Sequence, residues 1–175
     1  MDAGLHHLQG KAELVTDLLG LLQDFYRDKL RMYLRHQSAA RLVPQYDANN
    51  TYQYIINRDD VQLTWVAKAI EELGGAVPDV TEPAREAKGK AAAAAHAVIE
   101  EDGHDAQVFV DLWRPRIELM ANERHAKMLR VVLGEVLEQK RFFQQALAGR
   151  IDLLGQREVH LEPARGEVLP SRWIE

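Results

Sequence analysis

The sequence contains no cysteine among its 175 residues. This absence excludes a disulfide framework, a thiolate nucleophile and a zinc site with cysteine ligands. Aromatic residues make up only 7% of the chain and proline occurs six times, whereas alanine, leucine, glutamate and arginine are abundant. This composition favours helix over sheet. No segment approaches the run of about 20 apolar residues that a membrane span needs.

The chain also lacks a large excess of acidic or basic residues, because the formal net charge is only −5 at pH 7. The balance gives no reason to expect nucleic acid or an anionic membrane as a partner. The first residues lack the basic start and apolar middle of a secretion signal, and we therefore expect a cytoplasmic protein. The length of the chain suits one domain with a single core.

What the sequence does contain is apolar residues at the three-and-four spacing of helical faces. The pattern predicts helices at about 12–37, 84–101 and 116–148, and another from Asn49 or Asn50 to Gly74-Gly75. Asp2 could cap an earlier start of the first helix that includes Leu5 and Leu8. Gly103 should break the third helix. Pro115 should either lie in the first turn of the fourth, capped by Asp111, or kink a longer helix. Long helices with short connectors predict an all-α, antiparallel up-and-down four-helix bundle over residues 1–155.

Residues 156–175 contain two prolines, and the sequence predicts an extended C-terminal tail there. The part from Val168 to Ile174 carries a leucine, a tryptophan and an isoleucine. We expect these side chains to pack on the bundle or on a neighbouring subunit. The chain is accordingly expected to be a homo-oligomer, in the simplest case a homodimer.

Polar residues on the predicted apolar faces are the best lead to function, because bundles build buried sites from inward-pointing polar side chains. These residues are Glu118, Asn122, His125 and Gln139 in the fourth predicted helix, Asp59 and Gln62 in the second, and Lys29 and His36 in the first. An unpaired carboxylate or imidazole in a core is costly. These side chains should therefore pair with one another, hold a metal or border a wet cavity.

Two stretches, Ile55 to Gly75 and Glu118 to Leu137, resemble the second and fourth helices of the ferritin-like superfamily, in particular its rubrerythrin-like members. In that family each of these helices carries Glu-x-x-His, whose spacing puts a carboxylate and an imidazole on one iron, and each other helix adds a Glu. The matching pairs here are Asp59-x-x-Gln62 and Asn122-x-x-His125. Only His125 keeps the family residue. The resemblance thus implies a ferritin-like bundle whose di-iron ligands are largely replaced.

The departures from the family pattern leave two main hypotheses. In the first, the di-iron site is lost and the chain is a structural or interaction protein without cofactor or enzymatic activity. In the second, it is a metal-binding protein or oxidoreductase with a reduced site. Such a site would take iron or manganese on Asp59, Glu118 and His125, with Gln62 and Asn122 beside them.

One further observation bears on this choice. Lys29 could neutralise a buried carboxylate, and a salt bridge of that kind would replace the charge of a metal ion. A third hypothesis is a bundle that binds an apolar small molecule in a core cavity among Tyr26, Tyr33, Asp59 and His125.

Overall fold

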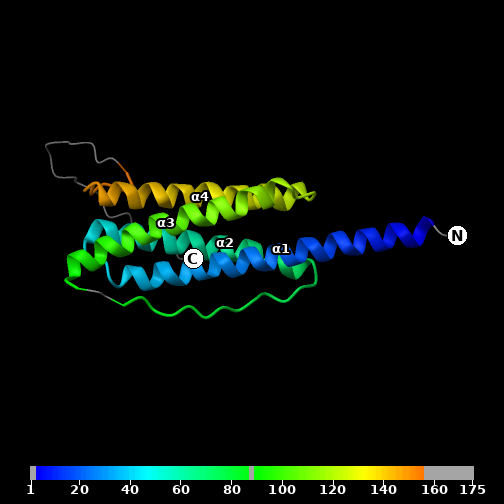
Figure 1. The fold of residues 1–175 in the computed structure, drawn as a ribbon, viewed down its shortest axis with the longest axis horizontal. Helices are drawn as coiled ribbons and strands as arrows, with labels where there is room; N and C mark the ends of the chain where they lie inside the picture. The colour runs from blue at the N-terminus through cyan, green and yellow to red at the C-terminus, as the bar shows by residue number, and fades with distance from the viewer. Residues whose placement is uncertain (1–2, 87–88, 156–175) are drawn as a thin grey trace, which may run out of the picture.

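The chain folds into a bundle of four α-helices, and the computed structural model describes residues 3–86 and 89–155, with side chains from residue 18 onward. The helices are α1 (Ala3–Ala40), α2 (Tyr46–Glu72), α3 (Ala91–Glu118) and α4 (Glu123–Leu147). Helix α1 packs against α2, and α3 packs against α4. The two hairpins meet through α1–α3 and α2–α4 contacts (Figure 1). The predicted all-α four-helix bundle is confirmed.

The connection between α2 and α3 is longer than the sequence predicted. Near its start, Gln23 of α1 donates a hydrogen bond from Nε2 to the carbonyl oxygen of Ala76 at 2.9 Å. Near its end, the amide of Arg85 donates to the hydroxyl of Ser38 at 2.5 Å. Gln23 and Ser38 are about 22 Å apart along α1 at about 1.5 Å per residue. The segment therefore runs back along the bundle, and α2 and α3 point in the same direction (Figure 1).

The predicted boundaries of the third and fourth helices were wrong. Helix α3 begins at Ala91 and continues through Gly103 and Pro115 to Glu118. A glycine costs only about 1 kcal/mol in a helix interior, and α3 has buried residues on both sides of Gly103. The space beside Gly103 is taken by Phe143 of α4, whose Cβ would lie 3.5 Å from an added methyl group. Packing against α4 therefore carries α3 past the predicted break.

Helix α4 begins only at Glu123, where the side chain of Asn122 accepts a hydrogen bond from the amide of His125 at 3.1 Å. Asn122 is therefore the N-cap that the sequence analysis had placed inside a longer helix. Helix α1 takes the earlier of its two expected starts, at Ala3, and α2 starts at Tyr46, a few residues before the expected Asn49 or Asn50. Helix α2 ends at the predicted glycines, and Gly74 has a positive φ of 77°, as is common just past a helix C-terminus.

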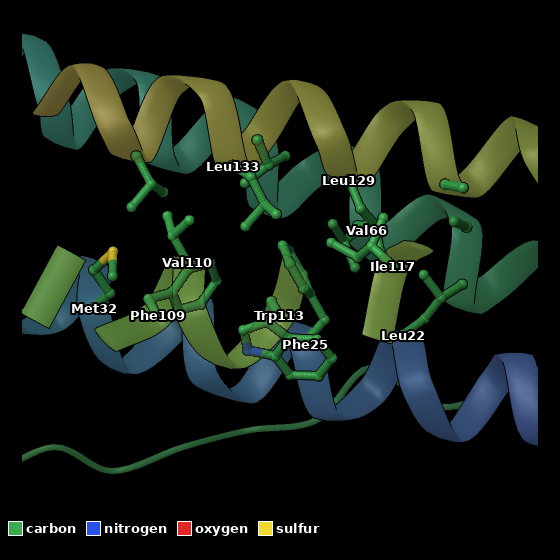
Figure 2. Close-up of a cluster of buried hydrophobic side chains, with 14 of the residues drawn as sticks. Leu22, Phe25, Met32, Val66, Phe109, Val110, Trp113, Ile117, Leu129 and Leu133 are labelled. Atoms are coloured by element: carbon green, nitrogen blue, oxygen red, sulfur yellow. The ribbon is translucent and has the colours of Figure 1, made fainter. Parts of the chain in front are cut away.

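The core consists of two apolar clusters at different levels of the bundle. In the larger cluster, the rings of Phe25 and Trp113 meet edge to face with centroids 4.9 Å apart. Figure 2 shows these rings from α1 and α3 in the same interior as Leu129 and Leu133 of α4. The smaller cluster contains Tyr52, Phe143 and their neighbours. Because α1, α2, α3 and α4 all contribute to each cluster, the two hairpins share one interior.

Across the described ranges, no helix combines the length and the apolar character that are required to cross a membrane. The predicted tail, residues 156–175, lies outside the described part of the chain. Its packing therefore stays a prediction.

Candidate functional site

Buried polar side chains form a layer between the two apolar clusters. On each helix, at least one of them lies in the sequence between members of the larger and the smaller cluster. The residues of this layer with at most 3% exposure are Lys29 and His36 of α1, Asp59 and Gln62 of α2, Asp102 of α3 and Gln139 of α4. All four helices thus bring hydrogen-bonding or charged groups to the middle of the bundle, where each charge needs a partner.

Asp59 is the centre of this layer, and both of its carboxylate oxygens are occupied. The ammonium group of Lys29 lies 2.6 Å from Oδ1, and Nε2 of Gln139 donates to the same oxygen at 2.7 Å. Nδ1 of His36 lies 2.9 Å from Oδ2. An ionised carboxylate only accepts hydrogen bonds, so His36 carries a proton on Nδ1. The Asp59 centre therefore joins α1, α2 and α4.

The partners of Asp59 keep it ionised in spite of its burial. Burial alone would raise its pKa, but the charge of Lys29 and the hydrogen bond from His36 lower the pKa from 3.8 to about 2. A lone buried carboxylate behaves in the opposite way and takes up a proton near neutral pH. The lowered pKa therefore shows that the ion pair, together with its hydrogen bonds, outweighs the loss of hydration.

A second chain of contacts leads from the layer to the surface between α2 and α4. Nε2 of Gln62 donates to Oε2 of Glu135 at 2.6 Å, and Nε of Arg58 donates to the same oxygen at 3.0 Å. The Oε1 atoms of Gln62 and Gln139 have no hydrogen-bond partner in the described part of the chain. Their amide nitrogens face carboxylates, so reversing either amide would put two acceptors together.

The second buried carboxylate, Asp102, has a different set of partners. The hydroxyl of Tyr52 donates to Oδ2 at 2.5 Å, and Nη2 of Arg85 lies 2.6 Å from Oδ1. Burial raises the pKa of Asp102, although His36, Arg85 and Tyr52 each lower it. Burial and the nearby Asp102 also raise the pKa of Tyr52 well above 10.0. Asp102 therefore ties α2, α3 and the long connection together, with weaker compensation than Asp59.

The structure does not bring the predicted metal-site residues together. Asp59 and Gln62 are buried in the middle of α2 as expected, but Glu118 is exposed at the end of α3. His125 is buried in the first turn of α4, with its Nδ1 unpartnered among the described residues. Gln139 contacts Asp59 and lies about 21 Å further along α4 than His125, at about 1.5 Å per residue. Asp59 and His125 are therefore at different levels of the bundle.

The residues around Asp59 do not fit a metal centre. Within residues 3–86 and 89–155, no three side chains of histidine, cysteine, aspartate or glutamate are grouped so that they could hold an ion. The position beside Asp59 is taken by the ammonium of Lys29, which has no lone pair and would repel a cation. The small-molecule hypothesis meets the same difficulty, because the Asp59 oxygens already have partners and His125 is distant.

Several members of the layer escaped the sequence analysis. Asp102 has the helical spacing of buried Val98, Ile99 and Ala106, but the predicted break at Gly103 hid it. Glu135, one turn from Gln139 on α4, was not among the predicted residues, although Gln62 contacts it. Arg85 gave no sequence signal at all, because it belongs to an irregular segment whose path depends on the bundle.

Comparison with known proteins gives the fold and nothing more. No family model matches the sequence, and no curated protein is similar to it. A crystal structure of a protein from Xanthomonas campestris pv. campestris has a TM-score of 0.55 and 14% sequence identity, and the match covers 78% of this chain and 92% of that chain. An identity this low shows a shared fold only. The chain is thus a four-helix bundle with a charged and closed interior layer.

Proposed function

We propose that this chain is a ferritin-like bundle in which a buried ion pair has taken the place of the metal centre, and that it acts as a homodimer in a structural or interaction role. One observation carries the proposal: the ammonium of Lys29 and the carboxylate of Asp59 are in contact at 2.6 Å with no exposure to solvent. The negative charge that would attract a metal ion is already neutralised there.

The path of the chain supports the ferritin-like part of the proposal. Ferritin-like folds are bundles with one long crossover connection, and the segment between α2 and α3 runs beside α1 in this way. The position of the polar layer is a second support, because metal sites of such bundles are built from facing side chains inside the core. Across the α2–α4 interface, Asp59 and Gln62 face Gln139 and Glu135.

The chemistry of the layer supports a role without catalysis. A di-iron centre needs about four carboxylates and two imidazoles, whereas one carboxylate, one imidazole, one ammonium and one amide meet around Asp59. A catalytic acid or base must be within hydrogen-bond reach of its substrate, but Asp59 and Lys29 are both fully buried. The Asp59 centre fixes α1, α2 and α4 in one register, and any interaction with a partner would then take place at the surface of the bundle.

Metal analysis of the untagged full-length protein tests this proposal. We expect far less than one iron or manganese ion per chain after purification. We also expect that the protein retains neither ion when it is incubated with an iron(II) or manganese(II) salt under anaerobic conditions and then dialysed against buffer without metal. Asp59→Asn is the matched variant, since it keeps the size of the side chain and removes its charge. One or more ions per wild-type chain, lost in Asp59→Asn or in His125→Ala, would overturn the proposal in favour of a metalloprotein.

A further inference from the structure

Helix α1 is much longer than the bundle that it helps to form. The end of α2 marks the last level of the bundle, because Gly75 lies directly against the side chain of Leu19. Helix α1 starts at Ala3, so residues 3–17 extend about 22 Å further at about 1.5 Å per residue. Figure 1 shows this part of α1, in dark blue, beyond the ends of the other three helices. We call residues 3–17 the α1 extension.

The sequence of the α1 extension has the spacing of a helix that pairs with another helix. Leu5, Leu8, Ala12 and Val15 alternate at intervals of three and four residues. The same alternation continues into Leu19 and Leu22, which pack in the larger core cluster of the bundle. We call Leu5, Leu8, Ala12 and Val15 the seam, because apolar residues at this spacing, repeated every seven residues, are typical of helices that pack side by side in coiled coils. An isolated helix of this length is only marginally stable in water.

We propose that the α1 extension pairs with the α1 extension of a second copy of this chain, and that this contact holds the homodimer together. The inference rests on the homodimer of the proposed function and names its surface. Among the described residues, helices α2, α3 and α4 are all used inside the bundle and do not reach the extension (Figure 1). A second copy supplies the missing helix. Two identical segments related by a two-fold axis can bury each other's apolar residues and form a closed dimer.

Other occupants fit this seam less well. The sequence of residues 156–175 contains Pro163, Gly166 and Pro170, and proline in particular is unfavourable in the interior of a helix. A membrane surface would favour lysines and arginines on the polar face, whereas the extension carries one lysine, Lys11, and two acids, Glu13 and Asp17. A helix of like composition is therefore the partner that the segment fits.

The oligomeric state of the full chain tests this inference. By light scattering after size exclusion, we expect a particle of twice the chain mass of 19.9 kDa. Leu8→Lys/Val15→Lys places two charges in the seam, and we expect the dissociation constant of the dimer to rise by about 100-fold or more. The matched control is His7→Lys/Leu14→Lys. It adds the same charges at the same seven-residue spacing on a different side of the helix, and it should dimerise like the wild type.

Two results would overturn the inference, and they are distinguishable. A wild-type chain that stays monomeric at about 200 µM removes both the homodimer and its seam. If Leu8→Lys/Val15→Lys dimerises with an unchanged dissociation constant, the chain is a homodimer, but the seam is not its contact surface. Neither result depends on the metal content of the protein. Because the substitutions lie outside the bundle, each variant should keep its helical circular dichroism and unfold cooperatively on heating, which will confirm that it is folded.

Discussion

The two buried carboxylates of this bundle, Asp59 and Asp102, differ in the sign of their pKa shift although both are almost completely removed from water. Burial acts on both in the same direction, yet the pKa of Asp59 is lowered to about 2 and that of Asp102 is raised. Asp59 has a lysine of its own, with no exposure. Asp102 shares Arg85 with Glu101 and Asp105, which lie 3.8 Å and 3.5 Å from the guanidinium.

The difference shows that the partner, and not the depth of burial, decides how firmly a buried charge is held. A cation that is fully desolvated and has a single carboxylate in contact compensates burial best. At the Asp59 centre this condition holds, and the centre joins three helices of the bundle. At Asp102 the cation comes from the long connection and is divided among several acids. We therefore expect the Asp59 centre to stabilise the fold more strongly and over a wider range of pH.

The largest expected effect is that of Lys29→Met, which keeps an unbranched side chain of similar size and removes its charge. Asp59 would then be a buried carboxylate without its cation, which typically costs about 3–5 kcal/mol. Urea unfolding at pH 7 measures the loss. Lys68→Met, on an exposed position of α2, is the control and should change stability by less than about 0.5 kcal/mol.

A double variant keeps this prediction testable even if Lys29→Met alone does not fold. In Lys29→Met/Asp59→Asn neither charge of the Lys29–Asp59 pair remains, so the double variant should be more stable than Lys29→Met. If both variants and the wild type unfolded at the same urea concentration, the ion pair would have no part in holding the bundle together.

The same centre shows how far the sequence alone could lead. Asp59, Gln62, Lys29, His36 and Gln139 could all be predicted as buried, because each stands at the helical spacing of apolar neighbours, and the structure confirms their burial. The pairing of Lys29 with a carboxylate was also anticipated. Helical periodicity gives the face of one helix, however, and contains no information on which levels of two helices meet.

The errors have the same physical origin. His125 was aligned with Asp59 because the spacing within one helix cannot fix the register between two helices. Glu118 was assigned to the fourth helix because Gly103 and Pro115 are local breakers, and packing against α4 outweighs them. The long connection escaped prediction because its path follows contacts with Gln23 and Ser38. The fold class could thus be predicted from the sequence, whereas the composition of the polar layer required tertiary contacts.

The next largest effect concerns the pH dependence of stability. The pKa of Asp59 is lowered in the folded state, so its contribution is present above its ordinary pKa of 3.8 and is lost as the pH falls towards about 2. This difference corresponds to about 2–3 kcal/mol. Asp59→Asn should remove that contribution. The unfolding free energy of the variant should therefore fall less steeply than that of the wild type between pH 5 and pH 3, as measured by urea unfolding.

Asp102 provides the opposite sign in the same experiment. Its pKa is raised in the folded state, so its contribution is present below its ordinary pKa and is lost as the pH rises through the folded value. Asp102→Asn should therefore make the fall in stability at acid pH steeper. Equal slopes for Asp59→Asn and Asp102→Asn would contradict the contrast between the two carboxylates.

A smaller effect is expected for Arg85→Met. This change leaves Asp102 with the hydroxyl of Tyr52 as its remaining direct partner, and an unsatisfied buried group costs about 1–3 kcal/mol. Because burial already raises the pKa of Asp102, this carboxyl can take up a proton, and the loss measured at pH 7 should shrink at pH 5. Arg41→Met, at an exposed position, is the control. A loss that grows at pH 5 would show that Asp102 does not take up the proton.

The smallest effect should come from Arg58→Ala, where the polar layer reaches the surface. The side chains of Arg58 and Glu135 are 37% and 22% exposed, so their ion pair is hydrated and contributes about 0.2–1 kcal/mol. Glu135 also keeps the hydrogen bond from Gln62. Salt separates this pair from the buried one, because about 1 M NaCl screens exposed charges and acts much less on buried ones. The effect of Arg58→Ala should therefore fade in salt while that of Lys29→Met persists. If both effects were equally sensitive to salt, the Lys29–Asp59 pair would have to be accessible to solvent, and the contrast between a closed interior and an open rim would not hold.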